Sequence, residues 1–556
     1  MILEKVSKAI GEGLGFELNF EFSKAYGDVS VSPSELIRAS KDNSLSVIDL
    51  VAKLDDVAST ALGDIVEKTE YINGFFNVYL SDQIIVSELS KILENVGSYV
   101  INTDAKSKVA VFDYSSPNIA KPFSVGHLRS TIIGQANLNC HKAVGYETVG
   151  INHIGDWGTQ FGKLIVAIKK WGDEEKIAQD PIAKLNQLYV KFHSEAENDP
   201  KLNDEARQWF LKLEKNDEEA RRLWEKCVAW SFTEFDELYK KLGVKIDHVI
   251  GESFYENMLD EVVTELKEKK LLKESEGALI VDLDDLPPAL IKKTDGATLY
   301  LTRDLAALKY RIEKYKPHKV VYHVGNDQAL HFRQLEEVAE KLGWLNDIEV
   351  VFAGHGLLRL AEGKMSTRQG RVVLLGSLID EAIKRSVAII DSKNPGLKNK
   401  REVARKIGVS AIKYSDLYQN RKSDIIFSMD KAITMDGNSG PYIQYSYARM
   451  TSLIGKFKSQ YEAEPIAALD GESEGLGKLL LMTPGVLLNA TSSSNPSLVC
   501  EHAYKISNLF NRYYEKEKIV TDSEESTREK IFAVFVAREV LGILLDILGI
   551  DRLDEI

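Results

Sequence analysis

Short apolar runs and longer amphipathic segments alternate along the middle of the chain, from Lys106 onward. Runs of this length are typical of buried strands, and apolar residues at every third or fourth position are typical of helices. The alternation predicts an α/β domain whose parallel strands are joined by right-handed helical crossovers. The expected strands lie in KVAVFDYS (108–115), ETVGINHIG (147–155), ALIVDL (278–283), HKVVYHVG (318–325) and IEVVFAG (348–354).

The two ends of the chain follow other patterns. The first part opens with a helix and closes with a strand-like segment, GFFNVYL (74–80), whereas the last part carries amphipathic helical segments at 442–459, 498–517 and 527–547. The polar stretch from Tyr461 to Gly477 is expected to be a loop. The expected domains are a small N-terminal α/β domain (1–105), a central α/β domain (106–385) with a helical insertion at about 170–245, a helical connecting segment (386–439) and an all-α C-terminal domain (440–556).

The composition excludes several classes of protein. At 556 residues the chain is too long for one hydrophobic core, and 44% hydrophobic with 28% charged residues is typical of soluble globular domains. No apolar run reaches the length of a membrane span and the first residues lack a signal-peptide core, so we expect a cytoplasmic protein. Cys140, Cys227 and Cys500 form no C-x-x-C pair, so neither disulfides nor a zinc site are expected.

The net charge of −13 argues, taken alone, against binding to nucleic acid. The charge is unevenly distributed, however, because residues 396–424 hold eight Lys/Arg against three acids. Apolar residues at helical spacing, such as Val403 and Ile407, predict a helix in this segment. The segment is therefore either a solvated basic helix face or an RNA contact.

Two clusters of residues suit phosphate groups. In the first, Gly126-His127 open a helical segment that is expected to run to about Ala143. The first N–H groups of a helix lack partners and its dipole favours anions, so this helix start predicts an anion site. The second cluster is Gly363-Lys364-Met365-Ser366-Thr367-Arg368. Either cluster alone is more often a capped helix or a solvated loop.

Together with their neighbours, these clusters resemble those of a known family. SSPNIAKP (115–122), HIGDWGTQFG (153–162), LYLTRD (299–304) and KMSTR (364–368) occur in the order found in arginyl-tRNA synthetases, and the two clusters resemble the HIGH and KMSKS motifs of class I aminoacyl-tRNA synthetases. The resemblance implies an ATP-dependent arginine–tRNA ligase that works through an arginyl adenylate. It also implies a Rossmann-like catalytic domain with ligands at the carboxyl ends of the strands.

The resemblance also implies which residues contact ATP. His127 and Lys364 are the catalytic candidates, because a histidine at a helix N-terminus and a mobile point charge suit the developing charge on phosphorus and on pyrophosphate. Mg²⁺ is expected to travel with ATP, held mainly by phosphates and water, with no metal ligands from the protein. The ATP-binding candidates are Lys121, Ser124, Gly126, His127, Lys364, Met365 and Ser366.

The chain departs from the family pattern at both motifs. Ser124 stands where the first motif usually has a histidine, and Ser124 cannot carry charge. The second motif continues with Thr367-Arg368, a substitution that arginyl enzymes commonly show.

Recognition of arginine requires acceptors in a plane and an ionised carboxylate, because a guanidinium has five donors and a full charge. Thr302 is expected to cap the following helix, which would put Asp304 in the first turn, where the dipole favours its ionised form. Taken alone, Asp304 would be a helix-start carboxylate and Asp156 a turn residue. The resemblance places arginine on Ser116, Asn118, Asp156, Tyr300, Asp304 and Gln328.

The aromatic residues and arginine at 442–449 are either stacking partners for unpaired bases or core residues of a helical bundle. The resemblance makes the C-terminal domain an anticodon-binding domain and gives the N-terminal domain a contact with the outer corner of the tRNA. The last residues, 549–556, depart from the methionine-ended tail of the family. The candidate RNA contacts are Phe76, Arg401, Arg405, Tyr445 and Arg449.

The expected partners are tRNA(Arg), L-arginine and ATP, with the protein as a monomer away from membranes. The family also requires bound tRNA before it activates the amino acid. One alternative is a class I synthetase for glutamine or cysteine, against which Asp304 and Tyr300 argue. The other is a non-enzymatic RNA- or protein-binding relative, which would tolerate the loss of His127, Lys364 or Asp304, and all three are present.

Overall fold

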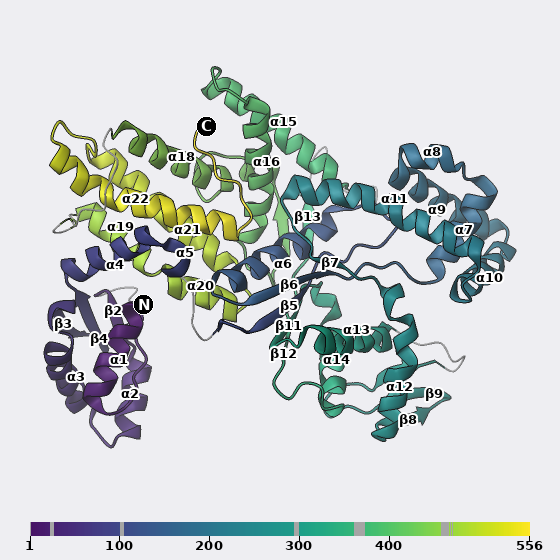
Figure 1. Ribbon diagram of the computed structural model, residues 1–556, viewed down its shortest axis with the longest axis horizontal. Helices are drawn as coiled ribbons and strands as arrows, with labels where there is room; N and C mark the ends of the chain where they lie inside the picture. The colour runs from purple at the N-terminus through teal and green to yellow at the C-terminus, as the bar shows by residue number, and fades with distance from the viewer. Residues whose placement is uncertain are drawn as a thin grey trace.

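A parallel sheet lies at the centre of the computed structural model, which describes residues 2–22, 27–99, 105–293, 300–360, 373–457, 466, 469 and 471–556 (Figure 1). All neighbouring strands of this sheet are parallel, which confirms the predicted α/β domain. Within the described residues the sheet has five strands in the order β12 (Glu349–Phe352), β11 (Lys319–Tyr322), β5 (Val109–Asp113), β6 (Glu147–Asn152) and β7 (His248–Val249).

Helices cover both faces of this sheet, because successive side chains of a strand point to opposite sides. Ala110 and Phe112 of β5 join the core that contains α6 (Val125–Ala143). Val111 joins a second core with α13 (Tyr300–Tyr315) and α14 (Ala329–Lys341), on the lower side of the sheet in Figure 1. Since β6 follows β5 on one side and β11 lies on the other, the strand order reverses at β5, and such sheets bind ligands at the carboxyl ends there.

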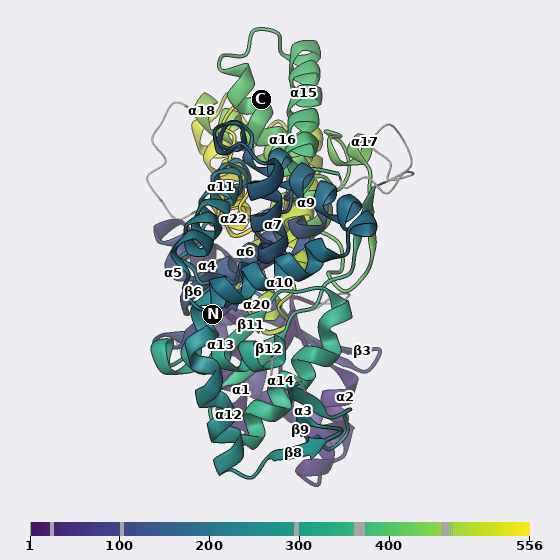
Figure 2. The same cartoon turned by 90° about the vertical axis from the view of Figure 1, so that its right-hand side faces the viewer.

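The helical insertion expected after β6 forms a separate bundle, at the upper right of Figure 1 and in front in Figure 2. Its last helix, α11, ends at Gly243 in the left-handed conformation (φ 65°), and the chain then enters β7. The helices of the bundle are α7 (Thr159–Trp171), α8 (Glu174–Gln179), α9 (Pro181–Asn198), α10 (Lys201–Glu214) and α11 (Glu218–Leu242).

The strand expected in ALIVDL (278–283) is present, but it does not belong to the parallel sheet. This run forms β9 (Ala278–Val281) of a separate antiparallel sheet, between β8 (Leu272–Ser275) and β10 (Ala289–Lys292). The physical reason is the two-residue turn Glu276-Gly277, where both residues have positive φ, because so short a connection permits only an antiparallel hairpin. A short helical segment, η3 (Glu252–Met258), and α12 (Leu259–Glu268) link β7 to this sheet.

The N-terminal domain has the predicted opening helix and the predicted strand in GFFNVYL (74–80), but two helices between residues 82 and 99 follow this strand, so it does not close the domain. Its antiparallel sheet follows the order β1 (Glu21–Phe22), β2 (Val29–Val31), β4 (Phe75–Leu80) and β3 (Val66–Ile72). Phe76 of β4 is 1% exposed and lies in the core of this domain. The helices are α1 (Ile2–Leu14), α2 (Pro33–Asp42), α3 (Val47–Ala61), η1 (Gly63–Ile65), α4 (Asp82–Glu94) and α5 (Val96–Tyr99).

The remainder of the chain is helical apart from one pair of short strands, β13 (Leu358–Leu360) and β14 (Ile425–Phe427), within the described residues. The predicted loop from Tyr461 to Gly477 lies partly outside those residues, and it is wrong from Gly471, where α19 begins. Leu476 and Leu480 of α19 are fully buried, and that burial stabilises the helix. The helices are η4 (Asn326–Gln328), α15 (Leu375–Lys393), α16 (Lys400–Leu417), α17 (Met429–Ala432), α18 (Gly440–Lys456), α19 (Gly471–Leu481), α20 (Thr483–Ser492), α21 (Ser497–Lys516) and α22 (Glu524–Ile547).

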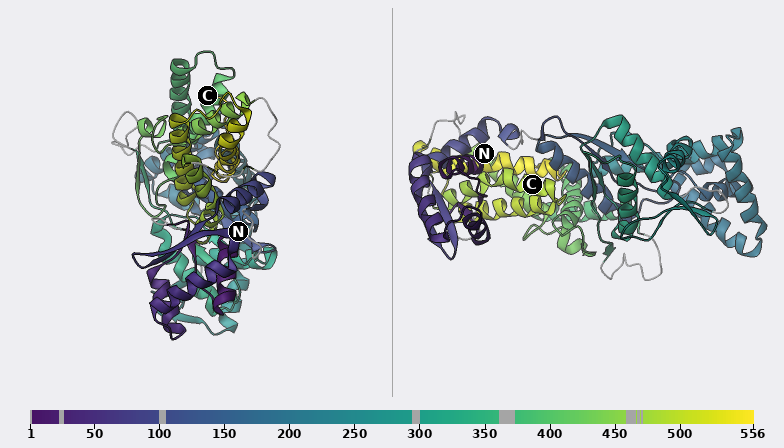
Figure 3. Two further views of the ribbon diagram at one scale, coloured as in Figure 1. Left: turned by 90° about the vertical axis from the view of Figure 1, so that its left-hand side faces the viewer. Right: turned by 90° about the horizontal axis from the view of Figure 1, so that it is seen from below.

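The molecule is elongated, with the N-terminal domain and the helical insertion at opposite ends (Figure 3, right). Helix α4 packs against α19 and α22, so the N-terminal domain is attached to the C-terminal helices rather than to the central sheet. An ion pair of 3.0 Å between Lys478 and Asp28 crosses the same boundary. Among the described helices, none combines the length and the apolar character needed to span a membrane.

Candidate active site

The start of α6 presents a histidine and backbone N–H groups at the carboxyl end of β5. Nδ1 of His127 accepts a hydrogen bond of 3.2 Å from the backbone N–H of Ser124, so in the neutral ring Nε2 carries the proton. Burial, assisted by the charge of Lys121, lowers the pKa of His127. The imidazole is therefore neutral at pH 7 and can act as a hydrogen-bond donor. Gly126 is exposed beside it, and Lys121 is exposed in the loop before it.

Ser124, which replaces the usual histidine of the first motif, is the N-cap of α6. Its Oγ accepts a hydrogen bond of 3.3 Å from the N–H of Gly126. A serine at this position typically stabilises a helix by about 1 kcal/mol relative to alanine. The serine therefore has a local structural role, independent of any contribution to the binding of ATP.

The chain returns from the second phosphate-suited cluster directly beside this helix start. The N–H of Val125 donates to the carbonyl of Val373 (3.1 Å), and the N–H of Leu375 donates to the carbonyl of Phe123 (3.0 Å). Lys364, Met365 and Ser366, with Thr367 and Arg368, lie outside the described residues.

The loop between β5 and α6 is held in an unusual backbone conformation. Ser115, Ser116 and Ala120 have φ values of 75°, 48° and 59°. Residues other than glycine occupy this region at a cost, roughly 1 kcal/mol or more each, and keep it where the surroundings impose it. Three contacts impose it here: Ser115 Oγ lies 2.8 Å from Tyr239 Oη, Ser116 N donates to Asn152 Oδ1 (3.0 Å) and Ala120 N donates to Ser231 Oγ (2.9 Å).

The same loop is joined to the loop that follows β6. The N–H of Ile119 donates to the carbonyl of Gly155 (3.1 Å), and Asn118 pairs with Gly155 as an isolated β-bridge. A Cβ on Gly155 would lie 2.3 Å from Oδ1 of Asn118, so a larger residue there would displace this amide. Ser116 and Asn118 are both half-buried, and this pairing brings them next to the strand end that carries His153.

Asp304 of α13 is held between two imidazoles. Its Oδ2 lies 2.6 Å from Nε2 of His331 on α14, and its Oδ1 lies 3.7 Å from Nε2 of His153, which follows β6. Enclosure by protein alone would raise the pKa of Asp304, but the His331 hydrogen bond and the two imidazoles outweigh it and lower that pKa. The carboxylate is ionised at neutral pH, as recognition of a guanidinium requires.

The prediction that Thr302 caps this helix is wrong. Helix α13 already includes Tyr300, and the buried hydroxyl of Thr302 donates to the carbonyl of Ile291 at the end of β10 (2.6 Å). Asp304 therefore lies in the second turn, and its charge is stabilised by the imidazoles rather than by a helix N-terminus.

The surroundings of Asp304 are acidic. Arg303 turns away from it toward Glu252 (3.3 Å) and Glu256 (2.9 Å). Burial, opposed by Arg303 and reinforced by the neighbouring carboxylates, raises the pKa of Glu252 to about 7. Arg311, two turns along α13, pairs with Asp113 at the end of β5 (2.7 Å). Because these arginines are paired elsewhere, the site keeps negative charge for a cationic ligand.

Three further arginine-binding candidates differ in how open they are. The side chain of Tyr300 is 67% exposed and Gln328 is exposed in η4, so both stand at the rim of the site. Asp156 is buried, and both of its carboxylate oxygens accept hydrogen bonds from Ser253, at 2.9 Å from the N–H and 2.6 Å from Oγ. These contacts favour the alternative in which Asp156 is a turn residue that fixes the loop after β6.

Reasoning from the sequence missed His153, His331 and Glu252. His153 was included in the motif HIGDWGTQFG, but nothing local showed that it faces Asp304. Glu252 follows the end of β7 by three residues, where ligands of open α/β sheets bind, whereas His331, in α14, had no local signal.

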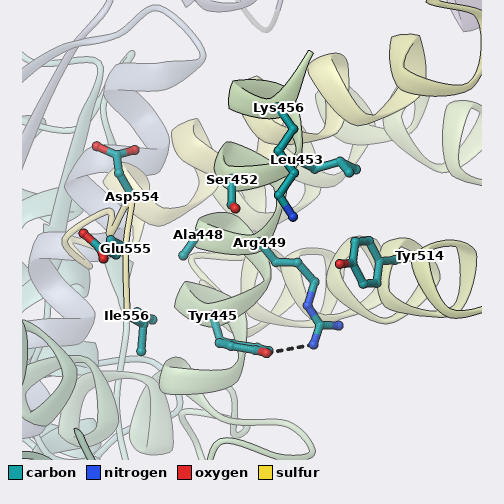
Figure 4. Close-up of a pocket in the computed structure, with 10 residues that line it drawn as sticks. All are labelled: Tyr445, Ala448, Arg449, Ser452, Leu453, Lys456, Tyr514, Asp554, Glu555 and Ile556. Carbon is teal, nitrogen blue, oxygen red and sulfur yellow. Dashed lines mark hydrogen bonds between the residues drawn. The ribbon is translucent and has the colours of Figure 1, made fainter. Parts of the chain in front are cut away.

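A cavity of about 290 Å³ lies between α18, α21 and residues 554–556 (Figure 4). The guanidinium of Arg449 lies 4.7 Å from the ring centre of Tyr445 and 4.9 Å from that of Tyr514, and it donates to Tyr445 Oη (2.8 Å). Aromatic rings and a guanidinium plane on one wall suit the stacking of unpaired bases. Asp554 and Glu555 line the opposite side.

The other RNA candidates have varied surroundings. Phe76 is a core residue, so packing is the role that the structure gives it. Arg401 is exposed on α16, whereas Arg405 is paired with Glu402 (2.8 Å) and Asp551 (3.2 Å). In the same basic segment, Lys413 and Arg421 are buried and donate to backbone carbonyls, so these two are not part of a solvated basic face.

Known proteins share this sequence and this fold. The family described as tRNA synthetases class I (R), catalytic domain, matches residues 88–429, and the DALR anticodon binding domain matches residues 443–556. Relatives named arginine–tRNA ligase include those of Halothermothrix orenii, 40% identical over 89% of each chain, and of an Exiguobacterium species, 40% identical over 99% of this chain and 98% of the relative.

Solved structures agree. Arginyl-tRNA synthetase from Plasmodium falciparum superposes with a TM-score of 0.84 at 26% identity, over 100% of this chain and 98% of that one. Arginyl-tRNA synthetase from Thermus thermophilus also gives 0.84, over 100% and 99% of the two chains, and at 20% identity it supports the fold alone. The family match, the relatives and the site geometry lead to one conclusion: this chain belongs to the arginyl-tRNA synthetase family of class I aminoacyl-tRNA synthetases.

Proposed function

We propose that this protein attaches L-arginine to tRNA(Arg), using ATP and forming arginyl adenylate as the intermediate. The observation that carries the proposal is the ionised Asp304, enclosed at the carboxyl edge of a sheet whose neighbouring loop leads to the His127 helix start. One side of the site suits a cationic side chain, and the other suits a polyphosphate.

In the first step, the carboxylate of arginine attacks the α-phosphorus of ATP, the bond to the β-phosphate breaks, and pyrophosphate leaves. Nε2–H of His127 and the N–H groups at the start of α6 are suited to hydrogen-bond the negative charge that develops. Lys364, on the segment that returns beside this helix, would contribute a point charge to the leaving phosphates. Mg²⁺ enters bound to ATP, and Lys121, Ser124, Met365 and Ser366 remain candidates for contacts with the nucleotide.

Selection of arginine would rest on Asp304. A guanidinium pairs with a carboxylate through parallel hydrogen bonds, and Tyr300 and Gln328 at the rim can close over it. Ser116 and Asn118 are the candidates to bind the amino-acid end, because they lie on the loop that connects β5 with α6. A glutamine or cysteine side chain carries no positive charge and would leave this carboxylate without a partner.

In the second step, the terminal ribose of tRNA attacks the adenylate carbonyl and AMP leaves. The wall formed by Tyr445 and Arg449, in the segment that matches the anticodon-binding domain, is the candidate contact for the far end of the tRNA. We further propose that the protein works in the cytoplasm as a monomer, with the domain boundaries expected from the sequence.

The test is ATP–pyrophosphate exchange with each amino acid in turn, with and without total tRNA. Among the amino acids, we expect only arginine to support exchange, and only when tRNA is present. Exchange that depends on glutamine or cysteine would contradict the arginine assignment. If none of the amino acids supports exchange, the result would favour the non-enzymatic alternative.

A further inference from the structure

The carboxylate of Asp304 has two different oxygens. Oδ2 is engaged by Nε2 of His331 at 2.6 Å. Oδ1 faces Nε2 of His153 at 3.7 Å, which is beyond hydrogen-bonding distance. The side chains of Asp304 and His331 are each about a quarter exposed, so this pair sits at the surface of the site that a ligand would cover.

No arginine or lysine of the described residues forms an ion pair with this carboxylate. On the same helix, Arg303 pairs with Glu252 and Glu256, and Arg311 pairs with Asp113. His331 is therefore the one hydrogen-bond partner of Asp304 in the described part of the chain. It comes from α14, whereas His153 follows β6.

We propose that His331 is a positioning residue for arginine: its imidazole fixes Asp304 with Oδ1 turned to the ligand, and a positive charge on that imidazole weakens the binding of arginine. This inference rests on the proposed function and assigns to the same site a second determinant of specificity. His331 acts through Asp304 and needs no contact with the reacting atoms.

The reason is that a protonated imidazole and the guanidinium of arginine would both interact with the single negative charge of Asp304. A neutral imidazole donates one hydrogen bond and leaves the full negative charge of Asp304 for the guanidinium. A protonated imidazole already neutralises that carboxylate, and it would repel a second cation bound to the other oxygen. Addition of a proton to this imidazole should therefore weaken the binding of arginine.

Other charged groups also lie near the pair. Asp304 stays ionised above pH 6 because its pKa is lowered, and Arg303 and Arg311 remain charged. Glu252 interacts electrostatically with Asp304, and His153 faces Oδ1, so both could contribute to a pH dependence. The experiment must therefore distinguish an effect of His331 on the pH dependence from effects of Glu252 and His153.

The experiment is calorimetric titration of the full chain with arginine between pH 6 and pH 8. We expect the wild-type dissociation constant to rise about tenfold at pH 6, since two cations then share one carboxylate. His331→Gln keeps an uncharged donor, so it should bind arginine within about threefold of the wild type at pH 8 and lose the pH dependence. His331→Ala removes the hydrogen bond to Asp304. It should raise the dissociation constant for arginine by a factor on the order of ten at pH 8 and leave the affinity for ATP unchanged.

His248→Gln, which changes an exposed histidine on β7, is the matched control and should behave like the wild type. The inference is overturned if wild-type binding does not change with pH. It is also overturned if His331→Gln retains the wild-type dependence, which would assign the effect to His153 or Glu252, or if His331→Ala binds arginine normally. A wild type that binds no arginine would instead overturn the proposed function, and this inference with it.

Discussion

At the residue scale, two side chains with opposite tasks define the proposed site. His127 is a neutral donor because burial lowers its pKa, and it stands at a helix start that attracts anions. Asp304 is an ionised acceptor because imidazoles outweigh the cost of its enclosure. The environment of each group, and not its residue type alone, sets the protonation state that the reaction needs.

Replacement of His127 by alanine should slow adenylate formation by a factor on the order of 10² to 10³, the typical effect of losing one transition-state donor. Single-turnover measurement of adenylate at saturating arginine, ATP and tRNA isolates the step. His248→Ala is the control. A variant that forms adenylate at the wild-type rate would remove His127 from the catalytic machinery.

Asp304→Asn should raise KM for arginine about a hundredfold and leave KM for ATP nearly unchanged. The amide keeps the shape of the side chain but leaves a guanidinium without its counter-charge, which typically costs roughly 3–5 kcal/mol, and partial exposure reduces the effect toward the lower end. Steady-state charging gives both constants. Glu313→Gln, an exposed carboxylate on the same helix, is the control, and equal changes for the two variants would contradict the assignment.

How far the sequence predicts such residues depends on how local their signal is. His127 could be predicted because glycine, histidine and helix start are adjacent in the chain. The pairing of Asp304 with His331 could not, since it depends on α13 and α14 packing side by side on one face of the sheet. Thr302 was misplaced for a similar reason: its partner, Ile291, belongs to a strand whose position the local pattern does not show.

At the element scale, α6 joins the proposed site to the C-terminal helices. Its first turn carries His127, its middle donates from Asn137 to the carbonyl of Ser494 (2.9 Å), and Asn139 donates to the carbonyl of Ile547 (3.0 Å). Arg129 is buried against Asp416 of α16 (3.0 Å). Strands and helices with long, clear periodicity, such as β5, α6 and α21, were predictable. The sheet to which β9 belongs and the helical structure of α19 were not, because the first depends on a turn and the second on a distant packing partner.

Buried histidines of these helices should make the fold sensitive to acid. Burial lowers the pKa of His502 on α21 to about 3 and that of His141 on α6 to about 4, against about 6.5 in an unfolded chain. Below pH 6.5 the unfolded chain gains protons that the folded chain does not, so stability that is complete above pH 6.5 is lost as the pH falls. The loss is about 2 kcal/mol per histidine between pH 7 and pH 5.

His502→Gln removes one such group and keeps a polar partner for Thr483, whose Oγ1 lies 3.0 Å from Nε2 of His502. The midpoint of thermal unfolding should therefore fall less between pH 7 and pH 5 in this variant than in the wild type. His248→Gln should not change the difference. If His502→Gln and the wild type lose equal stability, the histidine is not the cause.

At the scale of the whole molecule, a buried guanidinium connects the helical domain with the sheet. Arg421 donates to the carbonyl of Ser494 between α20 and α21 (2.9 Å) and to that of Gly354 just after β12 (2.6 Å). The cavity with Arg449 and Tyr445 is lined instead by α18, α21 and the last residues described, away from the carboxyl edge of the sheet. RNA contact and chemistry are therefore assigned to different parts of one elongated chain.

Arg449→Ala should raise KM for tRNA about tenfold, because base stacking on such groups contributes roughly 1–3 kcal/mol, and should leave KM for arginine and ATP unchanged. Charging at varied tRNA concentration measures the effect. Arg512→Ala on α21, where the side chain is 53% exposed and paired with Glu472, is the matched control. Equal KM values for tRNA in the two variants would argue that the rings and Arg449 only pack together.

The central claim, that this protein attaches arginine to tRNA, is tested most directly by the product itself. The protein is incubated with ATP, total tRNA and all twenty amino acids together, the charged RNA is digested with ribonuclease, and the aminoacyl-adenosine is identified by mass spectrometry. We expect arginyl-adenosine, absent when ATP is omitted and strongly reduced with Asp304→Asn. A different aminoacyl-adenosine, or none above the level of a reaction without enzyme, would contradict it.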